Sequence, residues 1–273
     1  MLRSIPSPTV SALEIGPLTI HLYALCIITG IAVAIWLGDK RFRAVVPHAT
    51  SVVSEIAITA VPIGIIGGRI YHVISSPDAY FGSGGHPIDA FKIWEGGLGI
   101  WGAISLGSLA AWFRYRQLTK KKVELPNFAY FMDALAPGVL LAQAIGRFGN
   151  WFNIELFGRP LNAPWALSVP PLKRPNGFSG FETFHPTFLY EALWSTAIAL
   201  LLIFFGRRFL PGQIFALYVF AYCLGRIGIE SIRIDEAHEF FGVRLNVWVA
   251  GFVGVGALIV YRRLRTKNIK VIE

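Results

Sequence analysis

Three arginines occupy positions in this sequence where a charge is unfavourable. Arg69, Arg147 and Arg226 each lie within or at the end of an apolar stretch. A cation at membrane depth marks a functional site by default, because hydrocarbon does not stabilise an unpaired charge. A guanidinium also matches two phosphate oxygens with parallel hydrogen bonds. The three positions therefore predict a site for an anion, and we expect a phospholipid head group.

The last of these arginines belongs to a charged helical face. Arg226, Glu230 and Arg233 stand at positions i, i+4 and i+7, which places them on one side of a helix. The carboxylate of Glu230 is expected to orient both guanidiniums.

Residues 146–158 contain the densest group of polar side chains near an apolar stretch. The segment combines one cation, one carboxylate and two carboxamides with three glycines; these polar residues are Arg147, Glu155, Asn150 and Asn153. Turn formation would account for the glycines and for Asn150. It would not account for Arg147, Asn153 and Glu155 together, so we expect this segment to contribute to the anion site.

The composition places these residues in a membrane protein. The chain of 273 residues is 54% hydrophobic and 15% charged, and its mean hydropathy of +0.55 is not that of a soluble globule. Seven windows approach the roughly 20 residues that a helix needs to cross a bilayer. They are residues 19–38, 50–74, 93–113, 126–146, 187–206, 212–230 and 245–261. We expect an all-α polytopic membrane protein with about seven transmembrane helices, forming one integral membrane domain over residues 1–273. Charges in three of the windows leave six or eight spans as alternatives.

The distribution of positive charge predicts an orientation. The connections 39–43, 114–122 and 207–208 and the tail 261–273 hold 15 of the 25 Lys and Arg residues. Cytoplasmic loops retain Lys and Arg, so the amino terminus is expected outside and the carboxyl terminus in the cytoplasm. Basic loops against an anionic inner leaflet also explain the net charge of +9, and no nucleic-acid partner is expected.

This orientation brings polar residues from several expected helices to the outer side of the membrane. The second, fourth and sixth helices run outward and end near the three arginines, whereas the first and fifth begin near Tyr23 and His185. A single arginine could instead snorkel to the surface or form an interhelical salt bridge. Convergence of all three at one depth favours a shared site.

The longest segment outside the expected helices is residues 147–186, which contains six prolines. By the charge rule it is an extracytoplasmic loop between the fourth and fifth helices, and its aromatic residues suit the membrane interface. Cys26 and Cys223 fall within expected helices, where small buried hydrophobes are typical. The six histidines lack ligand spacing, so we expect neither a metal site nor a cofactor.

Residues 146–158 resemble the signature of the prolipoprotein diacylglyceryl transferase family, Gly-Arg-x-Gly-Asn-x-x-Asn-x-Glu-x-x-Gly, at every defining position. The resemblance extends over nearly the whole chain. Its other matching elements are Gly67-Gly68-Arg69, Trp94-Glu95-Gly96-Gly97, His185-Pro186-Thr187-Phe188-Leu189-Tyr190-Glu191, and Arg226 with Glu230.

The resemblance implies an enzyme of the bacterial cytoplasmic membrane that acts in lipoprotein maturation. It would transfer the sn-1,2-diacylglyceryl group of phosphatidylglycerol to the lipobox cysteine thiol of a prolipoprotein signal peptide. A thioether would form and glycerol 1-phosphate would leave. Catalysis is expected from Arg147, Arg226, Glu155, Glu230, Asn150 and Asn153. The residues expected to bind phosphatidylglycerol are Arg147, Arg226, Arg69, Tyr23, His185, Tyr190 and Arg233.

Two positions depart from the family pattern. Many members carry a His-Gly-Gly triplet where this chain has Trp101-Gly102-Ala103, and that histidine has been offered as the base that activates the thiol. Tryptophan cannot accept a proton, so either another group does so or the thiol ionises with electrostatic help alone. The alternative acceptors are His185, His21 and Glu155. Phe188 also replaces a frequent glutamine.

A second class of function remains open on the sequence alone. A transporter or flippase of an anionic lipid or solute would also use intramembrane arginines and glycine-interrupted helices. The absence of an inverted repeat in the sequence and the clustering of polar residues at one face favour the transferase. A purely structural membrane scaffold would leave residues 147–158 unexplained.

Overall fold

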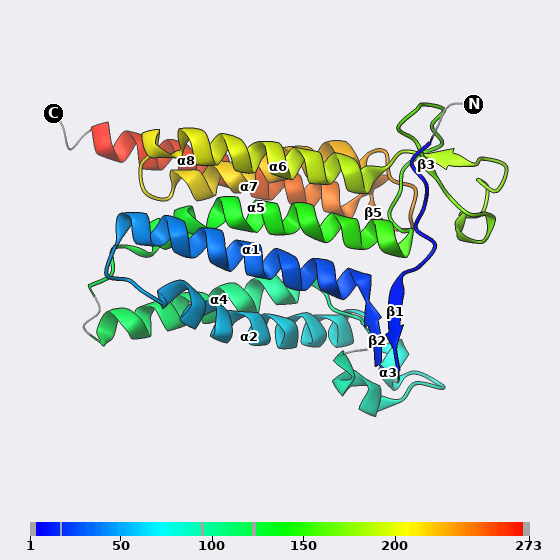
Figure 1. Cartoon of the computed structure of the whole chain (residues 1–273), viewed down its shortest axis with the longest axis horizontal. Helices are drawn as coiled ribbons and strands as arrows, with labels where there is room; N and C mark the ends of the chain where they lie inside the picture. The colour runs from blue at the N-terminus through cyan, green and yellow to red at the C-terminus, as the bar shows by residue number, and fades with distance from the viewer. Residues whose placement is uncertain (1–3, 17, 94–95, 122–123, 270–273) are drawn as a thin grey trace. The chain divides into compact units, whose positions relative to one another are not determined.

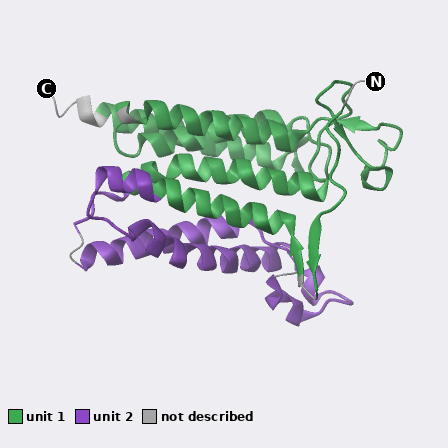
Figure 2. Ribbon diagram, viewed as in Figure 1, with its two compact units in different colours: residues 1–38, 129–273 green, residues 39–128 purple. Residues whose placement is uncertain are grey.

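The computed structural model describes residues 4–16, 18–93, 96–121 and 124–269. The chain divides into two compact units, and Figure 2 shows each in its own colour. The first unit comprises residues 1–38 and 129–273, and the second comprises residues 39–128.

The first unit is a bundle of long helices that run side by side in Figure 1. They are the first part of α1 (Leu22–Val45), most of α5 (Phe128–Asn153), and α6 (Thr187–Phe205), α7 (Gln213–Glu230) and α8 (Leu245–Ile269). Helices α1 and α5 pack closely through small residues: a Cβ on Gly138 would lie 2.9 Å from the Ala34 carbonyl oxygen. Such close backbone approach is typical of helix contacts in membranes.

A buried carboxylate fixes the start of α7. Asp133 on α5 accepts hydrogen bonds from the backbone N–H groups of Gly212 (2.6 Å) and Phe215 (2.8 Å). The first N–H groups of a helix lack partners within the helix, and a carboxylate there also interacts favourably with the helix dipole. Asp133 thus anchors the helix that carries Arg226 and Glu230.

The second unit is built on α2 (Val52–Ser75) and α4 (Ile100–Lys120), with the short α3 (Asp78–Phe81) and η1 (Pro87–Phe91) between them. Its two long helices approach through glycine. A Cβ on Gly67 would lie 2.5 Å from the Gly102 carbonyl oxygen, and one on Gly102 would lie closer still to the Gly67 carbonyl. A larger residue at either position would separate the helices.

Short antiparallel hairpins decorate the helices, although the expected fold contained none. They are β1 (Ala12–Ile15) with β2 (Leu18–His21), β3 (Leu167–Ser168) with β4 (Thr183–Phe184), and β5 (Glu239–Phe240) with β6 (Val243–Arg244). The described residues also form two further 3₁₀ helices, η3 (Pro171–Lys173) and η4 (Gly206–Arg208). The all-α class is confirmed, because these strands have only two to four residues each.

Each of the seven predicted windows overlaps a long helix in the described part of the chain, although α4 begins and ends seven residues later than the window 93–113. Six of these helices are long and apolar enough to cross a membrane: α1, α2, α5, α6, α7 and α8. The helix α4 has 21 residues but ends in a basic stretch, and it is not among the six. The protein is therefore a multi-pass membrane protein, and seven spans stays a prediction.

Candidate functional site

The signature segment lies at the end of α5. Residues 147–153 continue this helix, whereas we expected the loop to begin at residue 147. The helix ends because two of the next residues adopt the left-handed backbone conformation: Ile154 has φ 54° and Leu156 has φ 59°. A branched residue in the left-handed region is strained, and such strain clusters at functional sites. Both positions flank Glu155.

The polar side chains of this segment form one connected group. An Nη of Arg147 donates to the Asn150 carboxamide oxygen at 3.3 Å. The Asn150 amide in turn donates to Glu155 at 2.8 Å, and the Asn153 amide donates to the same carboxylate oxygen at 3.3 Å. The expectation that Arg147, Asn150, Asn153 and Glu155 act together therefore has a geometric basis.

Two of the predicted arginines meet through Glu191. The Arg147 Nε lies 2.7 Å from one oxygen of this carboxylate, and an Nη of Arg226 lies 3.3 Å from the other. Glu191 stands in the first turns of α6, and the arginines lie in the last turns of α5 and α7. A single carboxylate thus holds two guanidiniums from two different helices.

The other side of Arg226 is held by Glu230, as the i, i+4 spacing predicts. The two side chains approach to 2.7 Å, and Glu230 also contacts Arg233 at 3.3 Å and Arg244 at 2.8 Å. Asp235 pairs with Arg233 at 2.7 Å and with Arg244 at 2.9 Å. A continuous chain of ion pairs therefore runs from α5 to the β5–β6 hairpin.

This ion-paired set carries an excess of positive charge. It contains four guanidiniums against three carboxylates: Arg147, Arg226, Arg233 and Arg244 against Glu191, Glu230 and Asp235. A fourth carboxylate, Glu155, joins it through the carboxamide of Asn150.

The two arginines predicted to bind phosphate, Arg147 and Arg226, are more exposed to solvent than Arg233 and Glu230. The side chains of Arg147 and Arg226 are 21% and 17% exposed, whereas those of Arg233 and Glu230 are 6% and 0% exposed. A guanidinium has five N–H donors, and the contacts above use only part of them. Arg147 and Arg226 can accommodate an oxyanion, whereas Arg233 is enclosed by its carboxylate partners.

The pKa values of Arg233 and Asp235, which lie beyond α7, are shifted in opposite directions. Burial works against the charge of Arg233, but its hydrogen bond with Asp235 and the nearby carboxylates raise its pKa overall. Burial also disfavours the Asp235 carboxylate, yet Arg233 and Arg244 hold its pKa below the usual range. Both groups are therefore charged at neutral pH, as a stable positioning network requires.

Three segments meet beside the network because Gly158 allows them to approach. The Gly158 N–H donates to the His185 carbonyl at 3.0 Å, and the Arg159 N–H donates to the Ile232 carbonyl at 2.9 Å. A Cβ on Gly158 would lie 2.9 Å from the Ile232 carbonyl oxygen. The end of the signature is thus fixed between the start of α6 and the end of α7.

The predicted aromatic and histidine contacts lie in the same unit. The ring of Tyr23 packs where a Cβ on Gly149 would be, 2.5 Å from that position. His185 Nδ1 lies 3.1 Å from the Tyr190 hydroxyl, which accepts a hydrogen bond from the Trp165 indole at 3.2 Å. Burial, followed by the charge of Arg159, lowers the pKa of His185. This histidine is neutral at pH 7 and can accept a proton.

Arg69 has a different set of partners, all in the second unit. Its guanidinium donates to the backbone carbonyls of Ala90 (2.8 Å), Gly96 (2.6 Å) and Gly97 (3.2 Å), and to that of Asp89. Arg69 is buried, and these hydrogen bonds join α2 to η1 and to the two glycines that precede α4. Its contact with phosphatidylglycerol stays a prediction.

The departures from the family pattern have structural counterparts. Trp101 stands in the first turn of α4 and is 39% exposed. Phe188 is buried and stacks on Trp151, with ring centroids 5.9 Å apart. An aromatic cluster therefore replaces the polar contact that a glutamine would make. Of the Trp94-Glu95-Gly96-Gly97 match, Trp94 and Glu95 lie outside the described residues.

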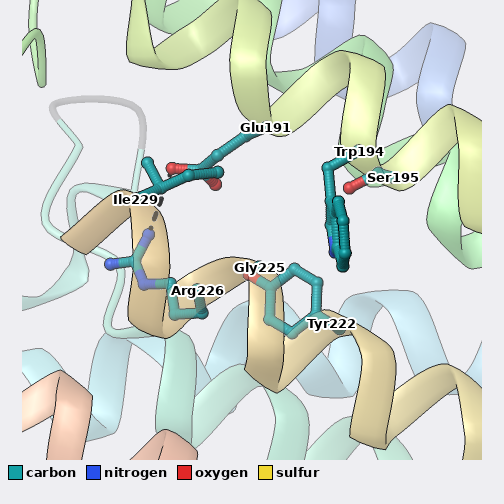
Figure 3. Close-up of a pocket in the computed structure, with 7 residues that line it drawn as sticks. All are labelled: Glu191, Trp194, Ser195, Tyr222, Gly225, Arg226 and Ile229. Carbon is teal, nitrogen blue, oxygen red and sulfur yellow. Dashed lines mark hydrogen bonds and ion pairs between the residues drawn. The ribbon is translucent and has the colours of Figure 1, made fainter. Parts of the chain in front are cut away.

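A small pocket opens beside Arg226 between α6 and α7. Figure 3 shows its lining residues, which are Glu191, Trp194, Ser195, Tyr222, Gly225, Arg226 and Ile229. The Trp194 indole donates to the Ala221 carbonyl at 2.9 Å. It fits because residue 225 is glycine: a Cβ there would lie 2.3 Å from the Trp194 nitrogen. Trp194 thus forms the wall of this pocket.

Some site residues were absent from the predicted set. Glu191 was matched to the family motif but not identified as a bridge, although a carboxylate within an apolar window signals an intramembrane partner. Asp235, Arg244 and Asn246 lie beyond α7, where the sequence offers no periodic pattern. Arg244 at the end of β6 and Asn246 at the start of α8 reach Glu230 only through the folding of the chain between them.

The fold and these contacts define a class: a multi-pass α-helical membrane protein with a buried guanidinium–carboxylate network at the ends of α5, α6 and α7. The sequence profile described as prolipoprotein diacylglyceryl transferase matches residues 10–262. This chain belongs to the prolipoprotein diacylglyceryl transferase family.

Several bacterial relatives are similar over most of the chain. Phosphatidylglycerol–prolipoprotein diacylglyceryl transferase 2 of Streptomyces coelicolor is 50% identical over 260 residues, which is 94% of this chain and 80% of that protein. The enzyme of Streptomyces griseus is 48% identical over 277 residues, covering 100% of this chain and 82% of that protein. The enzyme of Cutibacterium acnes is 49% identical over 259 residues, covering 94% and 85%.

Proposed function

We propose that this protein is a phosphatidylglycerol–prolipoprotein diacylglyceryl transferase. Family membership and relatives of that name at about 50% identity support the reaction. The observation that supports a location for the reaction is the pair of Arg147 and Arg226 on opposite oxygens of Glu191. A phosphodiester carries one negative charge, and its two free oxygens match the paired N–H groups of a guanidinium.

The reaction balances without a nucleophile from this chain. The sulfur of the lipobox cysteine in the prolipoprotein signal peptide attacks the glycerol carbon that bears the phosphate oxygen. A carbon–sulfur bond forms, the carbon–oxygen bond breaks, and glycerol 1-phosphate leaves with additional negative charge. The thiol proton passes to an acceptor. Guanidiniums fixed beside the departing oxygen lower the barrier because they interact more strongly as this charge develops.

The remaining predicted residues divide the work around this phosphate. Asn150, Asn153 and Glu155 position the glycerol head group, and their mutual hydrogen bonds support that role. Glu230 aligns Arg226, with Arg233 behind it. Tyr23 and Tyr190 contact the lipid at the edge of the site.

Two other assignments concern the regions around the site. His185, His21 and Glu155 are the alternative acceptors of the thiol proton, because a tryptophan occupies position 101. Of these, His185 has a lowered pKa and is neutral at pH 7. Arg69 contributes through its hydrogen bonds to the backbone carbonyls of Asp89, Ala90, Gly96 and Gly97.

The positive charge distribution supports the setting of the reaction. The protein lies in the bacterial cytoplasmic membrane with its amino terminus outside and its carboxyl terminus in the cytoplasm. In this orientation residues 154–186 face the exterior, where prolipoproteins present their lipobox. The whole chain acts as one integral membrane domain.

The purified protein in detergent, supplied with phosphatidylglycerol and a lipobox peptide, provides the test. We expect the peptide mass to rise by one diacylglyceryl group for each glycerol phosphate released. A lipobox peptide with serine in place of cysteine is the control and should remain unmodified. A folded protein that binds phosphatidylglycerol but forms no product would exclude the transferase and favour the transporter alternative.

A further inference from the structure

A residue outside the predicted set completes the coordination of Glu230. This carboxylate is fully buried at the end of α7, where an ionised group needs several partners. Its Oε2 contacts Arg226 at 2.7 Å and Arg233 at 3.3 Å. Its Oε1 accepts hydrogen bonds from Arg244 at 2.8 Å and from Asn246 at 3.2 Å.

The two oxygens of Glu230 therefore have separate duties. Oε2 contacts Arg226 and Arg233, whereas Oε1 is held by Arg244 and Asn246. A carboxylate that is hydrogen-bonded through only one oxygen can rotate about its terminal carbon–carbon bond. Its contact with a partner guanidinium then no longer has a fixed direction. The contacts on Oε1 thus determine how Oε2 presents itself to Arg226.

Arg244 is well placed to hold Oε1 because its own position is fixed by other contacts. Its Nη groups donate to the Arg233 carbonyl at 3.2 Å and to Asp235 at 2.9 Å. Arg244 therefore joins the end of α7 to the turn that follows it.

The hairpin that carries Arg244 is short and closed. Glu239 pairs with Arg244 across the two strands. Phe241 and Gly242 form the turn, with φ values of 52° and 70°. Two successive residues with positive φ are typical of the two-residue turns that match the twist of a hairpin. The Leu245 N–H donates to the His238 carbonyl at 2.8 Å and closes its base.

We infer that Arg244 is a positioning residue, which fixes the Glu230 carboxylate and through it directs the Arg226 guanidinium at the substrate phosphate. The inference rests on the proposed function of Arg226. Arg244 acts through Glu230: its side chain is 12% exposed, and Nε and both Nη groups already have partners within the network.

The test compares Arg244→Gln and Arg244→Lys, each alone and combined with Arg226→Lys, with Arg208→Gln as the matched control on an exposed arginine. We expect Arg244→Gln to lower kcat by about 10- to 100-fold with little change in the KM for phosphatidylglycerol. Arg244→Lys should restore part of the loss. In the Arg226→Lys background, Arg244→Gln should have almost no further effect, because its target is already altered.

Three outcomes would overturn the inference. They are an unchanged kcat in Arg244→Gln, losses that multiply in the double variant, and a raised KM for phosphatidylglycerol, which would make Arg244 a direct ligand. If Arg244→Gln does not fold, the same comparison uses Arg244→Lys. Full activity of Arg226→Lys and Arg226→Ala would instead refute the proposed role of Arg226, so the two failures are distinguishable.

Discussion

Glu191 holds two guanidiniums that would otherwise repel each other. Each of its oxygens contacts a different arginine, and its side chain is only 8% exposed. Removing one member of a buried ion pair leaves the others without compensation, which is more damaging than the loss of a surface pair. The spacing between Arg147 and Arg226 therefore depends on this carboxylate.

Glu191→Gln should reduce transfer strongly while the protein still folds. The amide keeps the shape but loses the charge, so the guanidiniums lose a common partner; we expect kcat to fall by roughly 10- to 100-fold. Initial rates with phosphatidylglycerol and a lipobox peptide provide the measurement. Glu182→Gln changes an exposed carboxylate and is the control. Equal activities of the two variants would refute the bridging role.

His185 makes the pH dependence of transfer testable. Burial and Arg159 lower its pKa from the ordinary value of 6.5, so the proton-accepting form persists below that pH. The same shift means that this histidine stabilises the fold above pH 6.5, and that the stabilisation is lost as pH falls through its lowered pKa. In the pH profile of kcat/KM, we expect activity to begin to fall only below pH 6.5. Arg159→Gln should move this fall to higher pH. A pH profile unaffected by both His185→Gln and Arg159→Gln would assign the proton to another group.

At the scale of elements, α6 and α7 are joined where Trp194 crosses Gly225. The indole occupies the space of a side chain at position 225 and also donates to the Ala221 carbonyl. The pocket beside Arg226 takes its shape from this contact. Glycine is required at this position for space and not for a special backbone angle.

Gly225→Ala should displace Trp194 and impair both packing and transfer. Overpacking of this kind destabilises a protein by about 1–3 kcal/mol, which predicts a lower unfolding temperature. Gly228→Ala is the matched control on the same helix, because nothing lies within 4 Å of a Cβ there. Thermal unfolding in detergent compares the stability of the two variants, and initial rates compare their transfer activity. An undisturbed Gly225→Ala protein would show that α6 and α7 tolerate separation.

The helices and part of the site were predictable from sequence, for physical reasons. Apolar windows of about 20 residues predict helices, because a helix of that length crosses a bilayer. Glu230 lies four residues from Arg226, so helical periodicity alone pairs them. The bridge from Glu191 was not predictable, because its partners lie on other helices and depend on packing. The role of Arg244 was not predictable either, because the strands of its hairpin have only two residues each and show no sequence pattern.

At the scale of the molecule, the charge distribution predicts which ends face the cytoplasm. Asn176→Cys, on the exposed surface of the 154–186 segment, should react with a membrane-impermeant maleimide in intact cells. Lys121→Cys, in a basic connection, should react only after the cells are opened. The wild-type protein, with Cys26 and Cys223 in helices, provides the background. The reverse labelling pattern would contradict the expected orientation.

The central claim is that Arg147 and Arg226 stabilise the departing phosphate, and single-turnover transfer by Arg226→Ala tests it most directly. The chemical step is measured with and without added ethylguanidinium, which can enter the space left by the side chain. We expect transfer to fall by about 10²- to 10³-fold or more, as for other lost transition-state contacts, and to recover in part with the added cation. A wild-type rate in Arg226→Ala without ethylguanidinium would contradict the account.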